Sequence, residues 1–383
     1  MLKSLFNKCV NLLRTKAFGW KTPYEVDIQD ALSYLDKIKE PKDDIARSYA
    51  QYRCQRYLMS KASLFLYNLG CMFLIIPYVI KCCLNRIKDK GNADVVFTIS
   101  IKDKKIIPES LRTKYDSERI TGVYEGFKLN KYDLSFILKL WKRHPFSFFF
   151  VHRIVFKIAI YRYFIERYHP KAIVINSEYS STSSIMTLYC EEQGVEHINI
   201  MHGEKLLYIR DSFFRFTKCY VWDEYYISLF KRLRAVGDQF VVETPPSLHF
   251  DVAHLSGSTP CCDYKYMLFE NEKLEGISKS IKCLKSKGLI VKVRPHPSYT
   301  DMGKLKALFD DEDIEDVNVP IASSVSNSGK VISLVSTVLL QAYFSGIEIV
   351  IDDVNYGQEY AKLKDLGYIL INKPHLRMSE LLN

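Results

Sequence analysis

Short apolar runs alternate with helix-like stretches along most of the chain after about residue 93. The runs are rich in β-branched residues, as buried parallel strands are. They begin at residues 93, 171, 195 and 218 in the first half and at 264, 289, 330 and 347 in the second. A weaker run at 122–127 is compatible with one more strand. Because strand–helix–strand crossovers are right-handed, this rhythm predicts α/β domains in which a parallel sheet carries helices on both faces.

Loss of this periodicity marks the domain boundaries. Residues 246–262 gain Pro, Ser and Gly and are expected to form a linker. We therefore predict a helical N-terminal segment at 1–90, a Rossmann-like domain at 91–245 and a second Rossmann-like domain at 263–383. The length of 383 residues also favours two domains over a single core.

The N-terminal segment carries two patterns that suit a membrane surface. Residues 1–14 place apolar side chains at helical spacing among Lys and Arg, which is typical of a basic interfacial helix or of a helix packed on its own domain. From Leu64 to Ile80 the only strongly polar side chain is Asn68. This stretch is short for a bilayer and contains Pro77, so a helix that lies on the membrane or is buried in the protein is favoured over one that spans it.

Composition narrows the class of partner and the compartment. The chain has 54 Lys+Arg and 44 Asp+Glu, a net charge of +10 that suits an anionic substrate or membrane surface. Nucleic acid is not expected as a partner, because the basic residues are spread out and no recognised nucleic-acid module appears. The ten cysteines form no C-x-x-C repeat, and no secretory signal is evident, which predicts free thiols in a reducing cytoplasm.

The loop after the apolar run at 289 carries the first candidate site. Arg294, His296 and Pro297 follow that run directly, and Pro295 and Pro297 restrict the backbone around the histidine. A histidine held in this way can donate to the phosphate of a departing nucleotide. The alternative is a turn with an incidental histidine, since two more His-Pro pairs occur at predicted helix boundaries.

Ser336 and Thr337 follow the apolar run at 330, where a helix is expected to begin. Hydroxyl side chains at this place cap the helix, and the same place offers backbone N–H groups and a positive dipole end to a phosphate. We expect the two strands to be neighbours, which would bring Ser336 and Thr337 beside His296 at the carboxyl edge of one sheet. Asp352 and Asp353 follow the last strand and are interpreted as a solvated strand end.

The first half offers candidates for the base that would deprotonate an acceptor. His202 and Gly203 follow the apolar run at 195, and Glu204 comes next. A histidine suits this task because its ordinary pKa is near the working pH. Glu204 is the rival base, and Glu178, after the run at 171, is a third candidate. The alternative for His202 is a loop residue bonded to the backbone.

Several common site motifs are absent. The sequence has no G-x-G-x-x-G, no H-E-x-x-H, no G-x-S-x-G and no Gly-rich loop with the lysine of a P-loop. No Asp-x-Asp pair follows a strand of the first half. We therefore expect no dinucleotide cofactor and no metal ion at the site.

Together, the His-Gly turn at His202, the run Arg294-Pro-His-Pro and the pair Ser336-Thr337 resemble bacterial surface-polysaccharide glycosyltransferases of the GT-B fold. The resemblance covers roughly residues 170–355. It is nearest to the capsule-type sialyl-, polysialyl- and Kdo-transferases, and wall-teichoic-acid CDP-glycerol polymerases share similar residues. The polysialyltransferase pattern has an acidic-acidic-Gly turn where this chain has Met201-His202-Gly203, whereas the teichoic-acid pattern begins with His-Gly.

The resemblance implies two Rossmann-like domains that face each other across a cleft, with an extra helical N-terminal segment. It implies transfer of a sugar, most plausibly sialic acid or a related acid from a CMP-sugar, to a glycan or lipid-linked glycan by metal-independent inverting displacement. His202 or Glu204 would act on the acceptor, and His296 with Arg294, Pro297, Ser336 and Thr337 would hold the donor. The setting would be capsule or O-antigen synthesis at the cytoplasmic face of the bacterial inner membrane.

Two other functions stay open on the sequence. A CDP-glycerol or ribitol phosphotransferase would use the same residues. A membrane-bound assembly protein with a degenerate transferase fold would suit the basic charge equally well. Such a protein would neither hydrolyse a nucleotide donor nor be stabilised by one.

Overall fold

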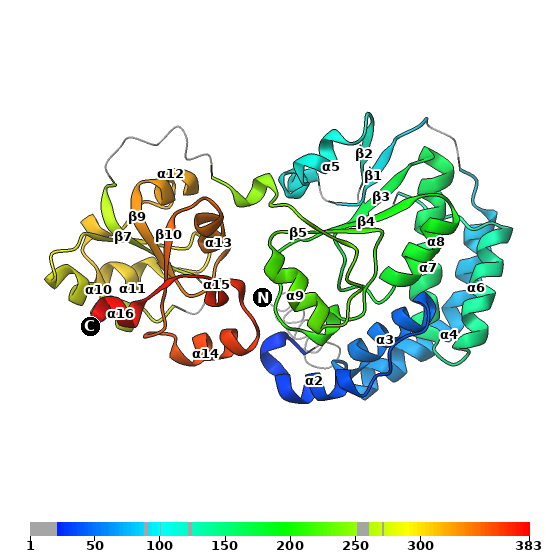
Figure 1. The fold of residues 1–383 in the computed structure, drawn as a ribbon, viewed down its shortest axis with the longest axis horizontal. Coiled ribbons are helices and arrows are strands. Elements are labelled where there is room, and N and C mark those ends of the chain that lie inside the picture. Colours follow the sequence, from blue (N-terminus) through cyan, green and yellow to red (C-terminus); the bar gives the residue numbers. More distant parts are fainter. Residues whose placement is uncertain (1–20, 88–90, 100, 122–124, 251–259, 270–271) are drawn as a thin grey trace, which may run out of the picture. The chain divides into compact units, whose positions relative to one another are not determined.

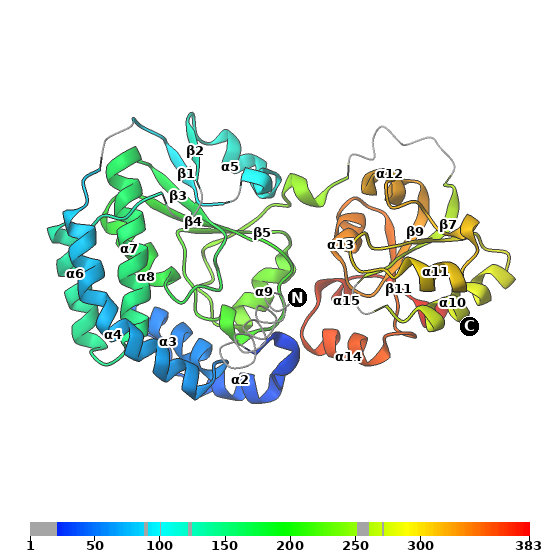
Figure 2. The ribbon, with the colours of Figure 1, turned by 180° about the vertical axis from the view of Figure 1, so that it is seen from behind.

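The computed structural model describes residues 21–87, 91–99, 101–121, 125–250, 260–269 and 272–383. The chain divides into two compact units, of which the first ends at Thr244 and the second begins at Pro245. Each unit contains one parallel sheet with helices against it (Figures 1 and 2). The α/β class and the two Rossmann-like units predicted from the pattern are confirmed.

The sheet of the first unit has the strand order β2-β1-β3-β4-β5-β6, and all its neighbouring strands are parallel. Its central strands are buried along their whole length, which is why they are continuous apolar runs in the sequence. Strand β2 (Glu118–Ile120) lies before the weak apolar run that was noted at 122–127 in the sequence. Residues 122–124 of that run lie outside the described residues. The strands are β1 (Val95–Phe97), β2 (Glu118–Ile120), β3 (Ala172–Ile175), β4 (Glu196–Ile200), β5 (Lys218–Val221) and β6 (Phe240–Val242).

Helix α7 (Phe148–Tyr168) is the central helix of the first unit. Phe150, Ile154 and Ile158 on it are fully buried, and it contacts α4, α6 and α8. This explains its long aromatic run, which fills the core of the first unit. The other helices of the unit are α2 (Ile28–Asp36), α3 (Asp44–Tyr57), α4 (Lys61–Leu84), α5 (Glu109–Thr113), α6 (Lys131–Arg143), α8 (Ser183–Glu192) and α9 (Glu224–Arg232), with 3-10 helices η1 (Pro23–Glu25), η2 (Ile101–Ile106) and η3 (Ile209–Asp211).

The N-terminal helices pack onto the first unit. Helix α3 lies against α8 and η3. The Gln51 amide donates to the backbone oxygen of Glu178 at 3.0 Å, and the Arg47 guanidinium donates to that of Arg234 at 3.1 Å. The described part of the N-terminal segment is therefore built into the first unit. The helix predicted at residues 1–14 lies outside the described residues.

The sheet of the second unit has the order β11-β10-β9-β7-β8, again with parallel neighbours. Its strands are β7 (Cys262–Met267), β8 (Val291–Arg294), β9 (Ser328–Ser333), β10 (Glu348–Ile351) and β11 (Leu376–Arg377). Its helices are α10 (Leu274–Ser286), α11 (Met302–Leu308), α12 (Ile321–Ser326), α13 (Thr337–Phe344), α14 (Gly357–Asp365), α15 (Ile369–Asn372) and α16 (Met378–Leu382), with 3-10 helices η4 (Pro246–Leu248) and η5 (Asp311–Asp313).

This strand order corrects one expectation from the sequence. The strands that precede His296 and Ser336 are β8 and β9, and they are not neighbours, because β7 pairs with both of them. Two strand spacings separate β8 from β9, roughly 10 Å. In sequence order β7 comes first, β8 then pairs with one of its edges, and β9 pairs with the other edge. Sequence order alone does not reveal this choice, since both neighbours of β7 are apolar runs of similar length.

The described part of the predicted linker packs on the second unit. The Gln341 amide on α13 donates to the backbone oxygen of Ser247 at 2.8 Å, and the Phe250 N–H donates to the Ser345 hydroxyl at 2.8 Å. Residues 251–259 lie outside the described residues. The cysteines that the structure describes are free thiols.

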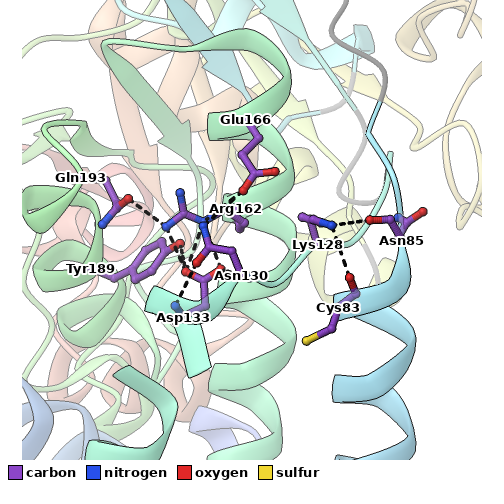
Figure 3. Close-up of polar contacts among 9 residues, drawn as sticks. All are labelled: Cys83, Asn85, Lys128, Asn130, Asp133, Arg162, Glu166, Tyr189 and Gln193. Atoms are coloured by element: carbon purple, nitrogen blue, oxygen red, sulfur yellow. Dashed lines mark hydrogen bonds and ion pairs between the residues drawn. The ribbon is translucent and has the colours of Figure 1, made fainter. Parts of the chain in front are cut away.

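A buried ion pair fastens α6 to α7 (Figure 3). The Arg162 guanidinium donates to both carboxylate oxygens of Asp133 at 3.0 Å, and the Tyr189 hydroxyl donates to the same carboxylate at 2.8 Å. Asp133 is fully buried and Arg162 is 6% exposed. Such a pair is costly to break, because removal of one partner leaves the other as an uncompensated charge.

We expect Asp133→Asn to lower the free energy of unfolding by about 3–5 kcal/mol, because the Arg162 charge then loses its counterion. Urea unfolding followed by circular dichroism measures the change. Glu380→Gln, which breaks the exposed Arg377–Glu380 pair, is the matched control and should leave the midpoint almost unchanged. Equal midpoints for the two variants would contradict this account of the pair.

Candidate functional site

Strands that run parallel bring their carboxyl ends to the same edge of a sheet, where α/β folds bind ligands. In the first unit, β4 ends at Ile200 and leads directly into His202 and Gly203. His202 is exposed. Gly203 has a backbone φ of 73°, in the left-handed region that residues with a Cβ rarely adopt. The structure thus places His202 at the tip of a tight turn at the carboxyl edge of this sheet.

Glu204 lies on the same loop but is more enclosed. Its carboxylate accepts a hydrogen bond from the Tyr226 hydroxyl on α9 at 2.7 Å, and its side chain is half-buried. A carboxylate that is held in this way is less accessible to an acceptor hydroxyl than the exposed imidazole of His202. His202 is therefore the more accessible of these two candidates for a base, and both lie within one loop.

Glu178 has a structural partner beneath this loop. Its carboxylate forms an ion pair with Lys205 and accepts a hydrogen bond from the Asn199 amide on β4 at 3.2 Å. Glu178 is 1% exposed. Burial lowers the pKa of the Lys205 ammonium, but the carboxylates of Glu178 and Asp211 outweigh it and hold the pKa above its ordinary value. Lys205 thus ties the end of the His202 loop to the end of β3, and this favours a positioning role for Glu178.

In the second unit, the loop after β8 holds His296 by three contacts. The His296 N–H donates to the Thr300 hydroxyl at 2.7 Å, and the Ser298 N–H donates to the ring Nδ1 at 3.1 Å. The ring also lies against Tyr299, with 4.5 Å between the centroids. Because Nδ1 accepts a hydrogen bond, the neutral ring carries its proton on Nε2. Nε2–H is then the group that could donate to a ligand.

Two residues around this loop, Thr300 and Glu272, were not identified from the sequence. Thr300 accepts from the His296 backbone and donates to the carboxylate of Glu272, so it links the His296 loop to the segment before α10. Burial raises the pKa of Glu272 above its ordinary value, and the hydrogen bond from Thr300 opposes this shift without cancelling it. The spacing of four residues between His296 and Thr300 was the only local signal, whereas Glu272 is reached only through the fold.

The structure gives Arg294 a different environment from the one expected. Its guanidinium donates to the Glu315 carboxylate at 2.7 Å and to the backbone oxygen of Val319 at 2.7 Å, and it is 8% exposed. Glu315 also accepts a hydrogen bond from the ammonium of the buried Lys265 at 2.5 Å. Contact of Arg294 with a phosphate would require these bonds to break. Arg294 therefore supports the base of the His296 loop, and the phosphate role predicted for it stays untested.

Ser336 and Thr337 begin helix α13, as predicted. The Ser336 hydroxyl accepts a hydrogen bond from the Leu339 N–H at 3.0 Å and so caps the helix. Thr337 is exposed at the first turn, and Pro297 is exposed in the other loop. Because β7 lies between β8 and β9, these hydroxyls and His296 stand at two separate strand ends of one edge. They could therefore contact different parts of one ligand.

The two sets of candidates belong to different units, with His202 and Glu204 in the first and His296, Ser336 and Thr337 in the second. Their approach across a cleft stays a prediction. Among the described residues, no group of three or more His, Cys, Asp or Glu side chains could hold a metal ion.

No protein-family model and no curated protein matches the sequence. Several solved structures are similar to the chain at low identity. The wall teichoic acid polymerase TagF is 13% identical, with 85% of this chain and 89% of that chain covered and a TM-score of 0.37. UDP-N-acetylglucosamine 2-epimerase from Rickettsia bellii is 12% identical, with 69% and 79% covered and a TM-score of 0.38. The glycotransferase of kitacinnamycin is 11% identical, with 78% and 92% covered and a TM-score of 0.41.

The cluster of Arg294, Lys265 and Glu315 predicts an acid-sensitive second unit. Burial raises the pKa of the Glu315 carboxyl, but the hydrogen bonds from Lys265, Ser324 and Arg294 outweigh it and hold the pKa below its ordinary value. Because the pKa of Glu315 is lower in the folded than in the unfolded chain, its ionised carboxylate stabilises the fold at pH values above the unfolded pKa of about 4.3. This stabilisation is lost as the pH falls through the pKa of the folded state.

We therefore expect Glu315→Gln to lower the free energy of unfolding by about 3 kcal/mol at pH 7, and by less at about pH 3.5. Urea titrations at the two pH values measure both effects. Glu312→Gln is the control, because Glu312 is exposed and no hydrogen bond of its side chain is among those described. A loss of the same size at both pH values would show that the ionised carboxylate is not the stabilising group.

Proposed function

We propose that the chain is a glycosyltransferase that moves a sugar from a nucleotide-sugar donor, most plausibly a CMP-sugar, to a glycan acceptor. The observation that carries this proposal is the His296 loop at the carboxyl edge of the second sheet. Thr300 holds the His296 backbone N–H and the Ser298 N–H holds the ring Nδ1, so Nε2–H is the donor that remains for a ligand. A preorganised donor of this kind stabilises the negative charge that develops on a leaving phosphate.

The reaction would be a single displacement. The acceptor hydroxyl oxygen forms the new bond to the anomeric carbon while the bond from that carbon to the phosphate oxygen breaks. His202 takes the hydroxyl proton, and the nucleotide phosphate leaves with a hydrogen bond from His296. The exposure of His202 supports its part in this scheme, since an acceptor glycan has to reach the imidazole from solvent.

Separation of β8 from β9 divides the donor contacts into two groups. His296 would hold the phosphate that leaves, and the start of α13 with Ser336 and Thr337 would hold another part of the same donor. A span of roughly 10 Å between the two strand ends suits a nucleotide-sized ligand better than a single phosphate group.

A phosphotransferase that uses CDP-glycerol is the second candidate, favoured by the His-Gly turn at His202 and Gly203. The leaving group is again a nucleotide phosphate, so His296 would keep its role. The two candidates differ in the donor they accept.

Donor binding is tested with thermal shifts of the purified protein in CMP-, CDP- and UDP-sugars and CDP-glycerol. We expect one nucleotide class to stabilise the protein. We expect His296→Ala to weaken that binding about 10- to 100-fold, because a hydrogen bond to a charged group contributes about 1.5–3 kcal/mol. His249→Ala is the matched control, since His249 is exposed in the same unit. No stabilisation by any donor would overturn the proposal in favour of a non-catalytic assembly protein.

The acceptor step is tested separately with His202→Ala. Loss of a general base slows transfer about 10²- to 10⁴-fold, whereas the donor-induced thermal shift should be unchanged. Transfer of radiolabelled sugar to membranes of cells that express the chain measures the rate. His169→Asn, at an exposed turn of the first unit, is the control. If Glu204→Gln abolishes transfer while His202→Ala retains it, the roles of the two residues are reversed.

A further inference from the structure

One face of helix α4 is apolar and exposed along its full length. At 100° per residue, six of the exposed apolar side chains fall within about 100° of one another on the helix. Their exposed fractions run from 41% to 76%. They are Phe65, Leu69, Phe73, Ile76, Ile80 and Leu84. We call this set the α4 outer face. Exposed apolar surface that is continuous over a helix of 24 residues marks an interaction site.

The opposite side of α4 is packed on the first unit. Cys71, Ile75 and Cys82 on that side are buried. The Asn68 amide oxygen accepts a hydrogen bond from the Phe149 N–H on α7 at 3.2 Å, and the rings of Tyr67 and Phe149 are stacked with 4.9 Å between centroids. The side of the helix that faces the protein is therefore already occupied.

The C-terminal end of α4 is fastened as well (Figure 3). The Lys128 ammonium donates to the backbone oxygens of Cys83 and Asn85, and the Leu129 N–H donates to the backbone oxygen of Cys82. Figures 1 and 2 both place α4 beside α7 at the outer edge of the first unit. A helix held along one side in this way cannot cross a bilayer without leaving α7, even though its length and hydropathy are sufficient to span one.

The charges around the α4 outer face are basic. Helix α4 has no Asp or Glu, and its charged residues are Lys61 near the start and Lys81 near the end, both exposed. Arg86 follows and is exposed. On the adjoining helix α6, Lys139 is exposed, whereas the only carboxylate, Asp133, is buried with Arg162. The apolar face is thus flanked by positive charge.

A hollow of about 750 Å³ opens beside this face near the end of α4. Its wall includes Ile76, Ile80 and Leu84 of the outer face together with Lys81 and Phe127. None of its lining residues belongs to the two candidate sites. An apolar hollow with an ammonium group at its wall suits a lipid chain and its anionic headgroup.

We propose that the α4 outer face docks the first unit onto the surface of an anionic lipid bilayer, with α4 lying in the plane of the membrane. Lys61 and Lys81 are twenty residues apart, about 30 Å along the helix. Positive charge at both ends suits a helix whose two ends meet one headgroup layer. A second copy of the chain fits less well, because it would bring the same basic residues against each other. This inference does not depend on the proposed transferase activity.

Flotation of the full chain with vesicles tests the proposal. We expect binding to vesicles of phosphatidylglycerol and phosphatidylcholine, and at least about tenfold weaker binding to phosphatidylcholine alone. The double variant Phe73→Asp/Ile76→Asp should lose binding at least about tenfold, because it places two charges on the apolar face. Met302→Asp adds a carboxylate at an exposed apolar residue of the second unit and is the control. Circular dichroism confirms that each variant is folded.

The depth of the helix distinguishes an in-plane from a spanning orientation. Leu66→Trp, Phe73→Trp and Ile80→Trp place a fluorophore along α4, and lipids brominated at different depths quench it relative to the unsubstituted protein. An in-plane helix gives one shallow depth at all three positions, whereas a spanning helix gives a gradient.

Three outcomes would overturn the proposal. They are a depth gradient along α4, vesicle binding that the double variant retains, and a stable dimer in solution that the double variant dissociates. Binding that is independent of anionic lipid would also contradict the role assigned to Lys61 and Lys81.

Discussion

Parallel pairing of the strands is the constraint on which the rest of this molecule depends. A parallel strand can be reached only by a crossover, so each connection adds a helix against the sheet and buries both faces. The same geometry brings the loops after β4, β8 and β9 to the carboxyl edges of their sheets. His202, His296 and Ser336 owe their positions to this rule rather than to any contact between them.

Buried ion pairs connect helices and loops that are not held by strand pairing. Asp133 and Arg162 join two helices, Lys205 joins the His202 loop to the end of β3, and Glu315 holds Arg294 at the end of β8. In each case the charged groups are far apart in the sequence or belong to different elements. The pairs of Lys205 and Arg294 restrict the loops that carry the candidate histidines, which is what a preorganised site requires.

The first unit also divides its helices by environment. Helix α7 is buried by its neighbours and the sheet, whereas α4 is buried on one side only. Both are long, but among the described helices only α4 is apolar enough to cross a membrane, whereas α7 carries several charged residues. The separation matters for the proposed docking, because the exposed side of α4 offers an apolar face to a bilayer surface.

The sequence by itself determined the α/β class, the two units and nearly every buried strand, because a run of β-branched residues such as Ala172–Ile175 is a local signal. It also indicated the ends of those strands and hence the loops of His202 and His296. Only the tertiary structure decided that β7 lies between β8 and β9. It also decided that Arg294 donates its hydrogen bonds to Glu315 and that the Thr300 hydroxyl donates to Glu272. These facts depend on which distant segments pair, and no local pattern of residues encodes that choice.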